Sequence, residues 1–327
     1  MRVLVTGGAG YVGSHAVRRL LQEGHEAVVF DNLQAGHREA VSVEMVEGDL
    51  TNRAAIFQAL KGRGIGAVMH FAAHIVVAES MAAPGKYFYN NVAGSINLLD
   101  AMVDAHIPYF VFSSTSEVYG EAQSLPLAED HPKQPTNAYG QSKWMVEQML
   151  QRYSAAYDLR SIALRYFNAA GAAEDGSIGE DHQPESHLIP AALLAALGQS
   201  TFALTCSPVD TPDGTTVRDY VHVEDLASAH ALSLDALAHG HPTDAFNVGL
   251  GVGYSTKQVI EAVQRITAVA FKVAEGAPRE GEPAARWASN EKIQRELGWT
   301  AAHDLTSIVS SAWRWHKSHP DGFASHA

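Results

Sequence analysis

Cysteine is almost absent from this sequence, since Cys206 is the only one in 327 residues. One cysteine excludes an intrachain disulfide and a cysteine-based metal cluster, and it favours a reducing compartment. Long apolar runs are also missing: no stretch approaches the roughly 20 apolar residues of a membrane span. The apolar run that begins MRVLVTGGAG is too short for a signal peptide. We therefore expect a cytoplasmic protein.

Positively charged residues are also few compared with negatively charged ones. Lys and Arg number 23 against 36 Asp and Glu, which gives a formal net charge of −13. This balance argues against a nucleic-acid or anionic-membrane partner, although backbone amides and one or two arginines can still hold a small phosphate. The 17 histidines are scattered without a familiar ligand spacing, so no metal is expected. The chain is 46% hydrophobic, which is enough to bury the core of one large or two modest domains.

A glycine-rich turn between an expected strand and an expected helix opens the chain. The predicted order is a strand at 2–5, the glycines Gly7, Gly10 and Gly13, a helix at 14–23, a strand at 27–30 and then Asp31. Glycines let the backbone approach a pyrophosphate at a helix N-terminus. An acid after the second strand accepts the ribose 2′-hydroxyl, which favours NAD over NADP. The segment predicts a dinucleotide-binding unit.

Strand and helix patterns continue to alternate after this unit. Strands are expected at 42–46, 67–70 and 109–112, with helices at 53–60 and 94–105. This alternation predicts an α/β fold with a doubly wound parallel sheet, whose ligands bind at the carboxyl ends of the strands. The segments HFAA (70–73) and SSTSEVYG (113–120) both follow expected strands. Asp49 either contacts the adenine or caps a turn.

The segment TNAYGQSKW places Tyr139 and Lys143 four residues apart. On a helix the two side chains share a face, and an ammonium beside a phenol lowers the pKa of that phenol. Thr115 follows an expected strand and adds a hydroxyl. Together these three groups can move a proton off an alcohol while a cofactor takes the hydride. The expected catalytic residues are therefore Thr115, Tyr139 and Lys143.

These motifs resemble the extended short-chain dehydrogenase/reductase superfamily. The resemblance is carried by GGAGYVGSH, HFAA and the Thr115, Tyr139 and Lys143 set. That superfamily includes epimerases, dehydratases, reductases and decarboxylases of sugar nucleotides. The first half of the chain therefore leaves the reaction open.

The second half narrows the resemblance. Asn168, Arg218 and Arg279 are isolated polar residues in contexts that resemble loops, and two arginines with an amide suit a diphosphate and a hexose. The segments VAES, KYFYNNVAGS and TPDGTTVRDYVHV are similar to those of the UDP-glucose 4-epimerase family. The resemblance runs from Met1 to about Trp315. It implies interconversion of UDP-glucose and UDP-galactose, with Tyr139 as the base, NAD as the cofactor and a homodimer as the assembly.

The resemblance also implies that different parts of the chain bind the cofactor and the substrate. Residues 1–165, with a returning segment near 218–246, would form the NAD-binding domain, and 166–327 a smaller α/β substrate domain. The residues implied for NAD are Gly7, Gly10, Tyr11, Val12, Gly13, Asp31, Asn32, Asp49, Leu50, Phe71, Ala72, Ala73, Asn90, Tyr139, Lys143 and Tyr166. Those implied for the UDP-sugar are Thr115, Phe167, Asn168, His187, Leu188, Arg218, Tyr220, Arg279 and Glu282.

Several positions depart from the pattern of that family. Thr115 keeps the hydroxyl of the usual serine, whereas Ile75 and Ala35 lose polar groups that usually face the ligands. Glu282 replaces an aspartate, and Arg286 stands at a position that the family links to tolerance of N-acetylated sugars. His187 stands where some relatives have asparagine, and no aromatic residue precedes Asp210.

Three other functions stay open at this stage. Glu117 follows Thr115 and Ser116 as in some sugar-nucleotide 4,6-dehydratases, where a glutamate removes the C5 proton. A second alternative is a 4-epimerase of another UDP-hexose, UDP-N-acetylhexosamine or UDP-pentose. A third is a non-catalytic NAD-sensing regulator on the same fold, because a fold does not fix a function.

Overall fold

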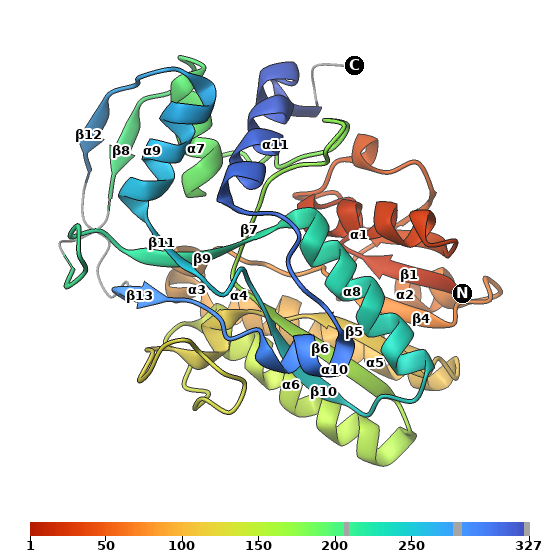
Figure 1. Cartoon of the computed structure of the whole chain (residues 1–327). Helices are drawn as coiled ribbons and strands as arrows, with labels where there is room; N and C mark the ends of the chain where they lie inside the picture. The colour runs from red at the N-terminus through yellow and green to blue at the C-terminus, as the bar shows by residue number, and fades with distance from the viewer. Residues whose placement is uncertain (206–208, 277–282, 324–327) are drawn as a thin grey trace.

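A computed structural model describes residues 1–205, 209–276 and 283–323 of the chain. Its largest sheet has seven strands in the order β10-β6-β5-β4-β1-β2-β3, and every neighbouring pair is parallel (Figure 1). The strands are β1 (Arg2–Thr6), β2 (Glu26–Asp31), β3 (Glu44–Glu47), β4 (Ala67–His70), β5 (Tyr109–Ser113), β6 (Arg160–Tyr166) and β10 (Asp244–Val248). The predicted doubly wound parallel sheet is confirmed.

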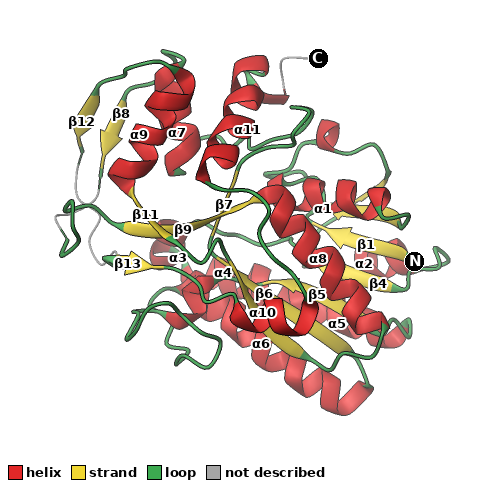
Figure 2. Ribbon diagram, viewed as in Figure 1, coloured by secondary structure: helices red, strands yellow, loops and turns green. Residues whose placement is uncertain are grey.

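Both faces of this sheet are covered by helices, as Figure 2 shows. Successive residues of a strand point to opposite faces, so Val3 and Val5 of β1 belong to one core and Leu4 to the other. The helices of this region are α1 (Tyr11–Gln22), α2 (Arg53–Leu60), α3 (Val77–Ala82), α4 (Pro84–Tyr87), α5 (Gly94–Asp104), α6 (Ala138–Tyr157) and α8 (Val223–Ala238), with the short turns η1 (Arg38–Ala40), η2 (Phe88–Ala93) and η3 (Ser116–Tyr119). The near-continuous apolar strands of the sequence follow from this double burial.

A smaller lobe lies beyond the carboxyl ends of these strands (Figure 1). It contains β7 (Asn168–Ala170), β8 (Phe202–Leu204), β9 (Val217–His222), β11 (Gly253–Ser255), β12 (Val273–Glu275), β13 (Ala285–Arg286), α7 (Leu188–Ala196), α9 (Thr256–Thr267) and α11 (Leu305–Ser318), whereas α10 (Glu291–Leu297) packs against β10 and α8. Its core joins α7, α9 and α11 through residues such as Leu193, Val263 and Ile308. The chain crosses between the two regions more than once. After β9 of the smaller lobe, α8 packs on α1 and β10 joins the edge of the large sheet. After β13, α10 packs against β10.

Two expectations of local structure were wrong. Asn168 and Arg218 were placed in loops, but they lie in β7 and β9, which pair with each other. These strands are short and lack long apolar alternation, so the sequence pattern did not reveal them. In addition, α1 begins at Tyr11 instead of Ser14, with Gly10 as its N-cap. The second and third glycines therefore belong to the helix start.

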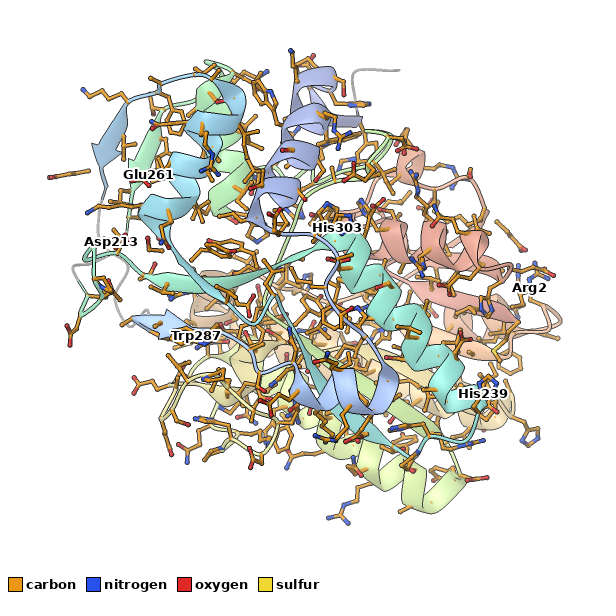
Figure 3. All side chains as sticks on the ribbon, in the orientation of Figure 1. Arg2, Asp213, His239, Glu261, Trp287 and His303 are labelled. Atoms are coloured by element: carbon orange, nitrogen blue, oxygen red, sulfur yellow. The ribbon has the colours of Figure 1, made fainter. Side chains whose placement is uncertain are left out.

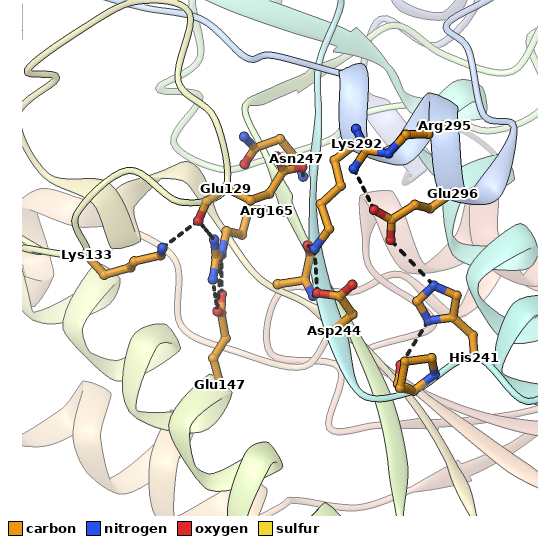
Figure 4. Close-up of polar contacts among 12 residues, drawn as sticks. Glu129, Lys133, Glu147, Arg165, His241, Asp244, Asn247, Lys292, Arg295 and Glu296 are labelled. Carbon is orange, nitrogen blue, oxygen red and sulfur yellow. Dashed lines mark hydrogen bonds and ion pairs between the residues drawn. The ribbon is translucent and has the colours of Figure 1, made fainter.

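A buried ion pair fixes α6 against the sheet (Figure 4). Arg165 of β6 and Glu147 of α6 approach to 2.6 Å, and their side chains are only 5% and 4% exposed. Ser114, just after β5, also donates a hydrogen bond of 2.5 Å to Glu147. The nearby carboxylate outweighs burial and raises the pKa of Arg165. These contacts hold the helix that carries Tyr139 beside the end of β5.

Within the described part of the chain, no helix is both long enough and apolar enough to cross a membrane.

Candidate active site

A cleft of about 680 Å³ separates the carboxyl edge of the large sheet from the smaller lobe. Most of the residues predicted for the two ligands line it, namely Gly7, Gly10, Tyr11, Val12, Gly13, Asp31, Asn32, Leu50, Phe71, Ala72, Ala73, Asn90, Thr115, Tyr139, Tyr166, Phe167, Asn168, His187, Leu188, Arg218 and Tyr220. Asp49 and Lys143 lie behind this lining, whereas Arg279 and Glu282 lie outside the described residues. The departures Ala35, Ile75 and Arg286 also face the cleft.

The turn between β1 and α1 can exist only with glycine at its narrow points. A Cβ on Gly13 would lie 2.1 Å from the carbonyl oxygen of Gly7. Gly7 itself has a φ of +70°, and a Cβ there would lie 2.5 Å from the nitrogen of Ala72. The turn is thus a close-packed backbone cradle that opens into the cleft at a helix N-terminus. This geometry fits the pyrophosphate of a dinucleotide.

Asp31, at the end of β2, organises the rim of this cradle. Its carboxylate accepts hydrogen bonds from the backbone amides of Ala9 (3.0 Å) and Leu33 (2.9 Å). Asn32 lines the cleft and donates a hydrogen bond of 2.8 Å to Asp49, so Asp49 helps to hold the side chain of Asn32 in place. The acid expected after the second strand therefore stands beside the glycine turn, where the ribose of NAD would lie.

Tyr139 and Thr115 meet at the centre of the cleft. Tyr139 lies in the first turn of α6, whose N-cap Asn137 accepts a hydrogen bond from the amide of Gly140. Burial raises the pKa of the Tyr139 phenol, and the neighbouring Thr115 hydroxyl acts in the opposite direction. The structure thus joins two of the three residues that the sequence predicted as catalytic.

Lys143 lies one turn further along α6 and is buried. Its ammonium group donates a hydrogen bond of 2.7 Å to the carbonyl oxygen of Ser113, at the end of β5. Burial lowers the pKa of Lys143 to about 7, although Glu147 acts to raise it. The pKa of Tyr139 is raised because burial is the largest influence on it, so the expected lowering of this pKa by Lys143 was wrong.

A chain of buried hydrogen bonds reaches Tyr139 from the sheet. His70 bonds Ser95, Ser95 donates to the carbonyl of Asn91, Asn91 donates to Ser142, and Ser142 donates to the carbonyl of Tyr139, over distances of 3.0, 2.5, 3.0 and 2.7 Å. Because Ser95 has one hydrogen to give, Nε2 of His70 must carry the proton. Burial lowers the pKa of His70 to about 3, which agrees with a neutral ring. The chain fixes the backbone at Tyr139.

The opposite wall of the cleft presents polar side chains from the smaller lobe. Asn168 donates a hydrogen bond of 2.6 Å to the carbonyl oxygen of Asp219, which joins β7 to β9. Arg218, next along β9, lines the cleft with Tyr220. An amide, an arginine and an aromatic ring on one wall can bind a nucleotide and its phosphates.

Glu117, the base of the dehydratase alternative, is occupied by other partners. Arg286 forms an ion pair and hydrogen bond with one of its oxygens, and Asn137 donates a hydrogen bond of 2.7 Å to the other. Arg286 also donates a hydrogen bond of 2.9 Å to the carbonyl of Gly120. With both oxygens engaged, Glu117 is placed as a bridge between η3 and β13. This arrangement does not favour Glu117 as a general base.

One polar cluster in the wall was not predicted from the sequence. Glu180, His182, Glu185 and His187 come together on the loop before α7, although only His187 was assigned a role. The repeated Glu-x-His spacing was the available signal. Segment 201–205, which contains β8, also lines the cleft and was not predicted, because it carries no chemically distinctive residue.

Comparisons with known proteins agree with this geometry. The profile described as the NAD dependent epimerase/dehydratase family matches residues 3–249. A UDP-glucose 4-epimerase of Lactobacillus helveticus is 45% identical, with 99% of each chain covered. A crystal structure of a UDP-glucose 4-epimerase is 43% identical with a TM-score of 0.96 and 99% of each chain covered.

A second solved structure carries ligands. It is a UDP-glucose 4-epimerase of Bifidobacterium longum in complex with NAD⁺ and UDP, 33% identical, with a TM-score of 0.94 over 99% of this chain and 100% of that one. The chain therefore belongs to the NAD dependent epimerase/dehydratase family and, within that family, to the group of UDP-glucose 4-epimerases.

Proposed function

We propose that this protein interconverts UDP-glucose and UDP-galactose, with NAD held in the same cleft throughout the reaction. The observation that carries the proposal is that Thr115 and Tyr139 lie beside each other in one cleft with the glycine turn at Gly7 to Gly13. The activity of relatives such as the Lactobacillus helveticus enzyme supports the choice of substrate.

The glycine turn, Asp31 and the first turn of α1 would hold the NAD. When bound, NAD⁺ supplies a hydride acceptor and a positive charge at the sugar C4, so that the sugar can pass through a ketone and be reduced again on its other face. In its phenolate form, which the positive charge of bound NAD⁺ would favour, Tyr139 would take the proton from the 4′-hydroxyl and return it. The hydroxyl of Thr115, beside Tyr139, would orient the phenolic oxygen.

The remaining groups keep the substrate in place and support Tyr139. Arg218, Asn168 and Tyr220 face the cleft from the smaller lobe, where they would anchor UDP while the sugar turns. Lys143 stays behind Tyr139 and ties α6 to the end of β5 through Ser113. In this proposal 1–165 and the returning segment near 218–246 bind NAD, while 166–327 mainly binds the UDP-sugar.

Two rival functions receive less support. Both oxygens of Glu117 are engaged, which argues against a 4,6-dehydratase. The buried Thr115 and Tyr139 pair would serve no purpose in a regulator that only senses NAD. A 4-epimerase with another UDP-sugar as its main substrate remains the alternative in substrate alone, and Arg286 on the cleft wall favours plain hexoses.

Product analysis tests the function directly. The purified protein is incubated without added NAD, separately with UDP-galactose and with UDP-N-acetylgalactosamine, and the products are identified by chromatography and NMR. We expect UDP-glucose as the main product from UDP-galactose, and less turnover of UDP-N-acetylgalactosamine. A 4-keto-6-deoxy sugar, or no turnover even after NAD is added, would contradict the proposal.

We also propose that the protein acts as a cytoplasmic homodimer in galactose metabolism. Support for a dimer comes from exposed apolar side chains on α3, η2 and α5, namely Met81 (61% exposed), Tyr89 (65%) and Ile96 (38%). Buried in an interface, such side chains favour association. The measurement is the mass in solution by light scattering, for the wild type and for Tyr89→Glu. A monomeric wild type would contradict the dimer.

A further inference from the structure

Two glutamates and two histidines form a compact cluster on the loop between β7 and α7. Glu180, His182, Glu185 and His187 can each offer one ligand atom, and these four atoms lie within 4.8 Å of one another. The donors belong to two Glu-x-His units within eight residues of sequence. Two imidazoles and two carboxylates form a ligand set that suits a divalent transition metal.

The spacing of these donors is close to what a metal requires. Zinc ligands at 2.0–2.2 Å in a tetrahedron stand roughly 3.3–3.6 Å apart. In the structure Nδ1 of His182 lies 3.1 Å from Oε1 of Glu180, and Nδ1 of His187 contacts the same oxygen. Both rings therefore already direct a nitrogen at one point. Small side-chain adjustments, without a backbone rearrangement, would place a cation between them.

The cluster is negatively charged when its histidines are neutral, and this charge would favour a bound cation. The side chains of Glu180 and Glu185 are only 4% and 8% exposed. Within residues 1–205, 209–276 and 283–323 their ion-pair partners are histidines, which carry charge only when protonated. Buried carboxylates are costly unless they are paired or coordinate a metal. A divalent cation would neutralise both.

The loop that carries the cluster is held on two sides, which would preserve a binding geometry. Trp315 of α11 donates a hydrogen bond of 3.0 Å from its indole nitrogen to the carbonyl of Glu180. Arg18 of α1 forms an ion pair of 2.9 Å with Asp175 of the same loop. In Figure 1 this green segment runs between α11 and α1. Ligands mounted on a fixed loop lose little freedom when they bind an ion.

The cluster also faces the cleft in which we propose that diphosphates bind. All four residues line that cleft, and the ring of Tyr11, at the start of α1, lies edge-on to His182 with 6.4 Å between centroids. When His182 and His187 are neutral, the two carboxylates in this wall would repel a diphosphate. A cation held there would remove the repulsion and attract the ligand.

From these observations we infer that Glu180, His182, Glu185 and His187 form a binding site for a divalent transition metal, with Zn²⁺ as its best-suited ion. The site is distinct from Tyr139 and performs no proton transfer. Its effect on diphosphate binding rests on the proposed function, whereas metal binding itself does not.

The test measures metal binding by calorimetry on the full-length protein after treatment with a chelator. Zn²⁺, Mn²⁺ and Mg²⁺ are titrated separately into the wild type and into His187→Ala, Glu180→Gln and His239→Ala. His239, labelled in Figure 3, is exposed and lies outside the cluster, so it serves as the matched control. We expect one Zn²⁺ per chain in the wild type and in His239→Ala, with weaker binding of Mg²⁺ because Mg²⁺ prefers oxygen ligands.

Loss of one ligand should weaken Zn²⁺ binding by at least roughly tenfold. His187 is half exposed, so His187→Ala should fold even if Glu180→Gln does not, and circular dichroism checks both. No Zn²⁺ binding by the wild type, or equal affinity in wild type and His187→Ala, would overturn the metal site.

A second measurement concerns the effect on ligand binding. UDP affinity is compared with and without Zn²⁺ by the same method. If Zn²⁺ binds and UDP affinity does not change, the link to the diphosphate is wrong while the metal site stands. The product analysis described above tests the proposed function separately.

Discussion

The two walls of the cleft are built in different ways. The wall that would hold NAD consists largely of backbone and small residues, such as Gly7, Gly13 and Ala72, which touch one another closely. The wall that would hold the UDP-sugar presents long polar side chains, including Arg218 and Arg286, from separate strands. The first is a shape made by the main chain, and the second is a set of charges mounted on strands.

This difference has a physical consequence for substitution. A backbone cradle has no spare volume, so one added methyl group displaces the main chain. A wall made of side chains can lose one contact and keep its shape, so a single substitution there should reduce ligand binding only in part. Tyr139 stands where the two walls meet and should be more sensitive than either.

The largest effect is expected for Tyr139→Phe. Removal of the phenolic oxygen eliminates the only proton carrier that the proposal assigns to the sugar hydroxyl, so turnover should fall by at least about 10². Steady-state kinetics with UDP-galactose gives the number. UDP binding, measured by calorimetry, should persist because the ring stays in place.

A matched control lies on the same helix. Tyr157, near the end of α6, is 57% exposed. Tyr157→Phe should keep full turnover. If Tyr139→Phe turned over at a similar rate, Tyr139 would have no catalytic role.

Gly13→Ala should damage the NAD wall selectively. The new methyl group would lie 2.1 Å from the carbonyl oxygen of Gly7, and the strain of moving that backbone, about 1–3 kcal/mol, corresponds to a loss of NAD affinity of roughly 5- to 140-fold. NAD content per chain is measured after denaturation. Gly85→Ala is the control, because nothing lies within 4 Å of a Cβ there. Equal NAD content in both variants would show that the cradle tolerates the added volume.

The same difference explains what could be predicted from the sequence. The glycine turn, Asp31 and the pair Tyr139 and Lys143 are local patterns, because strand, turn and helix fix them within a few residues. The large sheet followed from its apolar strands, which are buried on both faces. Local spacing was therefore enough to predict residues on the wall of the cleft that we propose for NAD.

The side-chain wall could not be predicted in the same detail. Arg286 reaches Glu117 across 169 positions of sequence, and no periodic pattern marks such a contact. Asn168 and Arg218 were assigned to loops because β7 has only three residues and β9 six. The Glu180 cluster was missed because its Glu-x-His spacing follows no familiar metal motif. This wall is formed by contacts between residues that are far apart in the sequence, and no local pattern predicts such contacts.

Acid should weaken the fold on the cofactor side. Burial lowers the pKa of His70 to about 3 and that of His230 to about 4, below the ordinary value of 6.5. Above pH 6.5 both rings are neutral in the folded and unfolded states and contribute nothing. Below it the unfolded chain binds protons that the folded protein excludes, so the free energy of unfolding falls by up to about 1.4 kcal/mol per pH unit for each ring.

Urea unfolding at about pH 7 and about pH 5 measures this slope, with fluorescence from the five tryptophans as the signal. A lower midpoint at the acidic pH is expected. An unchanged midpoint would mean that these rings take up protons in the folded protein, and that the hydrogen-bond chain from His70 to Tyr139 is not built around a neutral imidazole.

The smallest effect is expected where a single side chain joins the two walls. Arg286 of β13 binds Glu117 with one guanidinium nitrogen and the carbonyl of Gly120 with another, a double contact that lysine cannot reproduce. Arg286→Lys keeps the charge and loses one hydrogen bond, so the free energy of unfolding should fall by about 0.5–1.5 kcal/mol. Arg295→Lys, at an exposed ion pair, should change it by less than about 0.5 kcal/mol. If the two variants were equally stable, the bridge would not couple the walls, and each wall would have to hold its position through its own lobe.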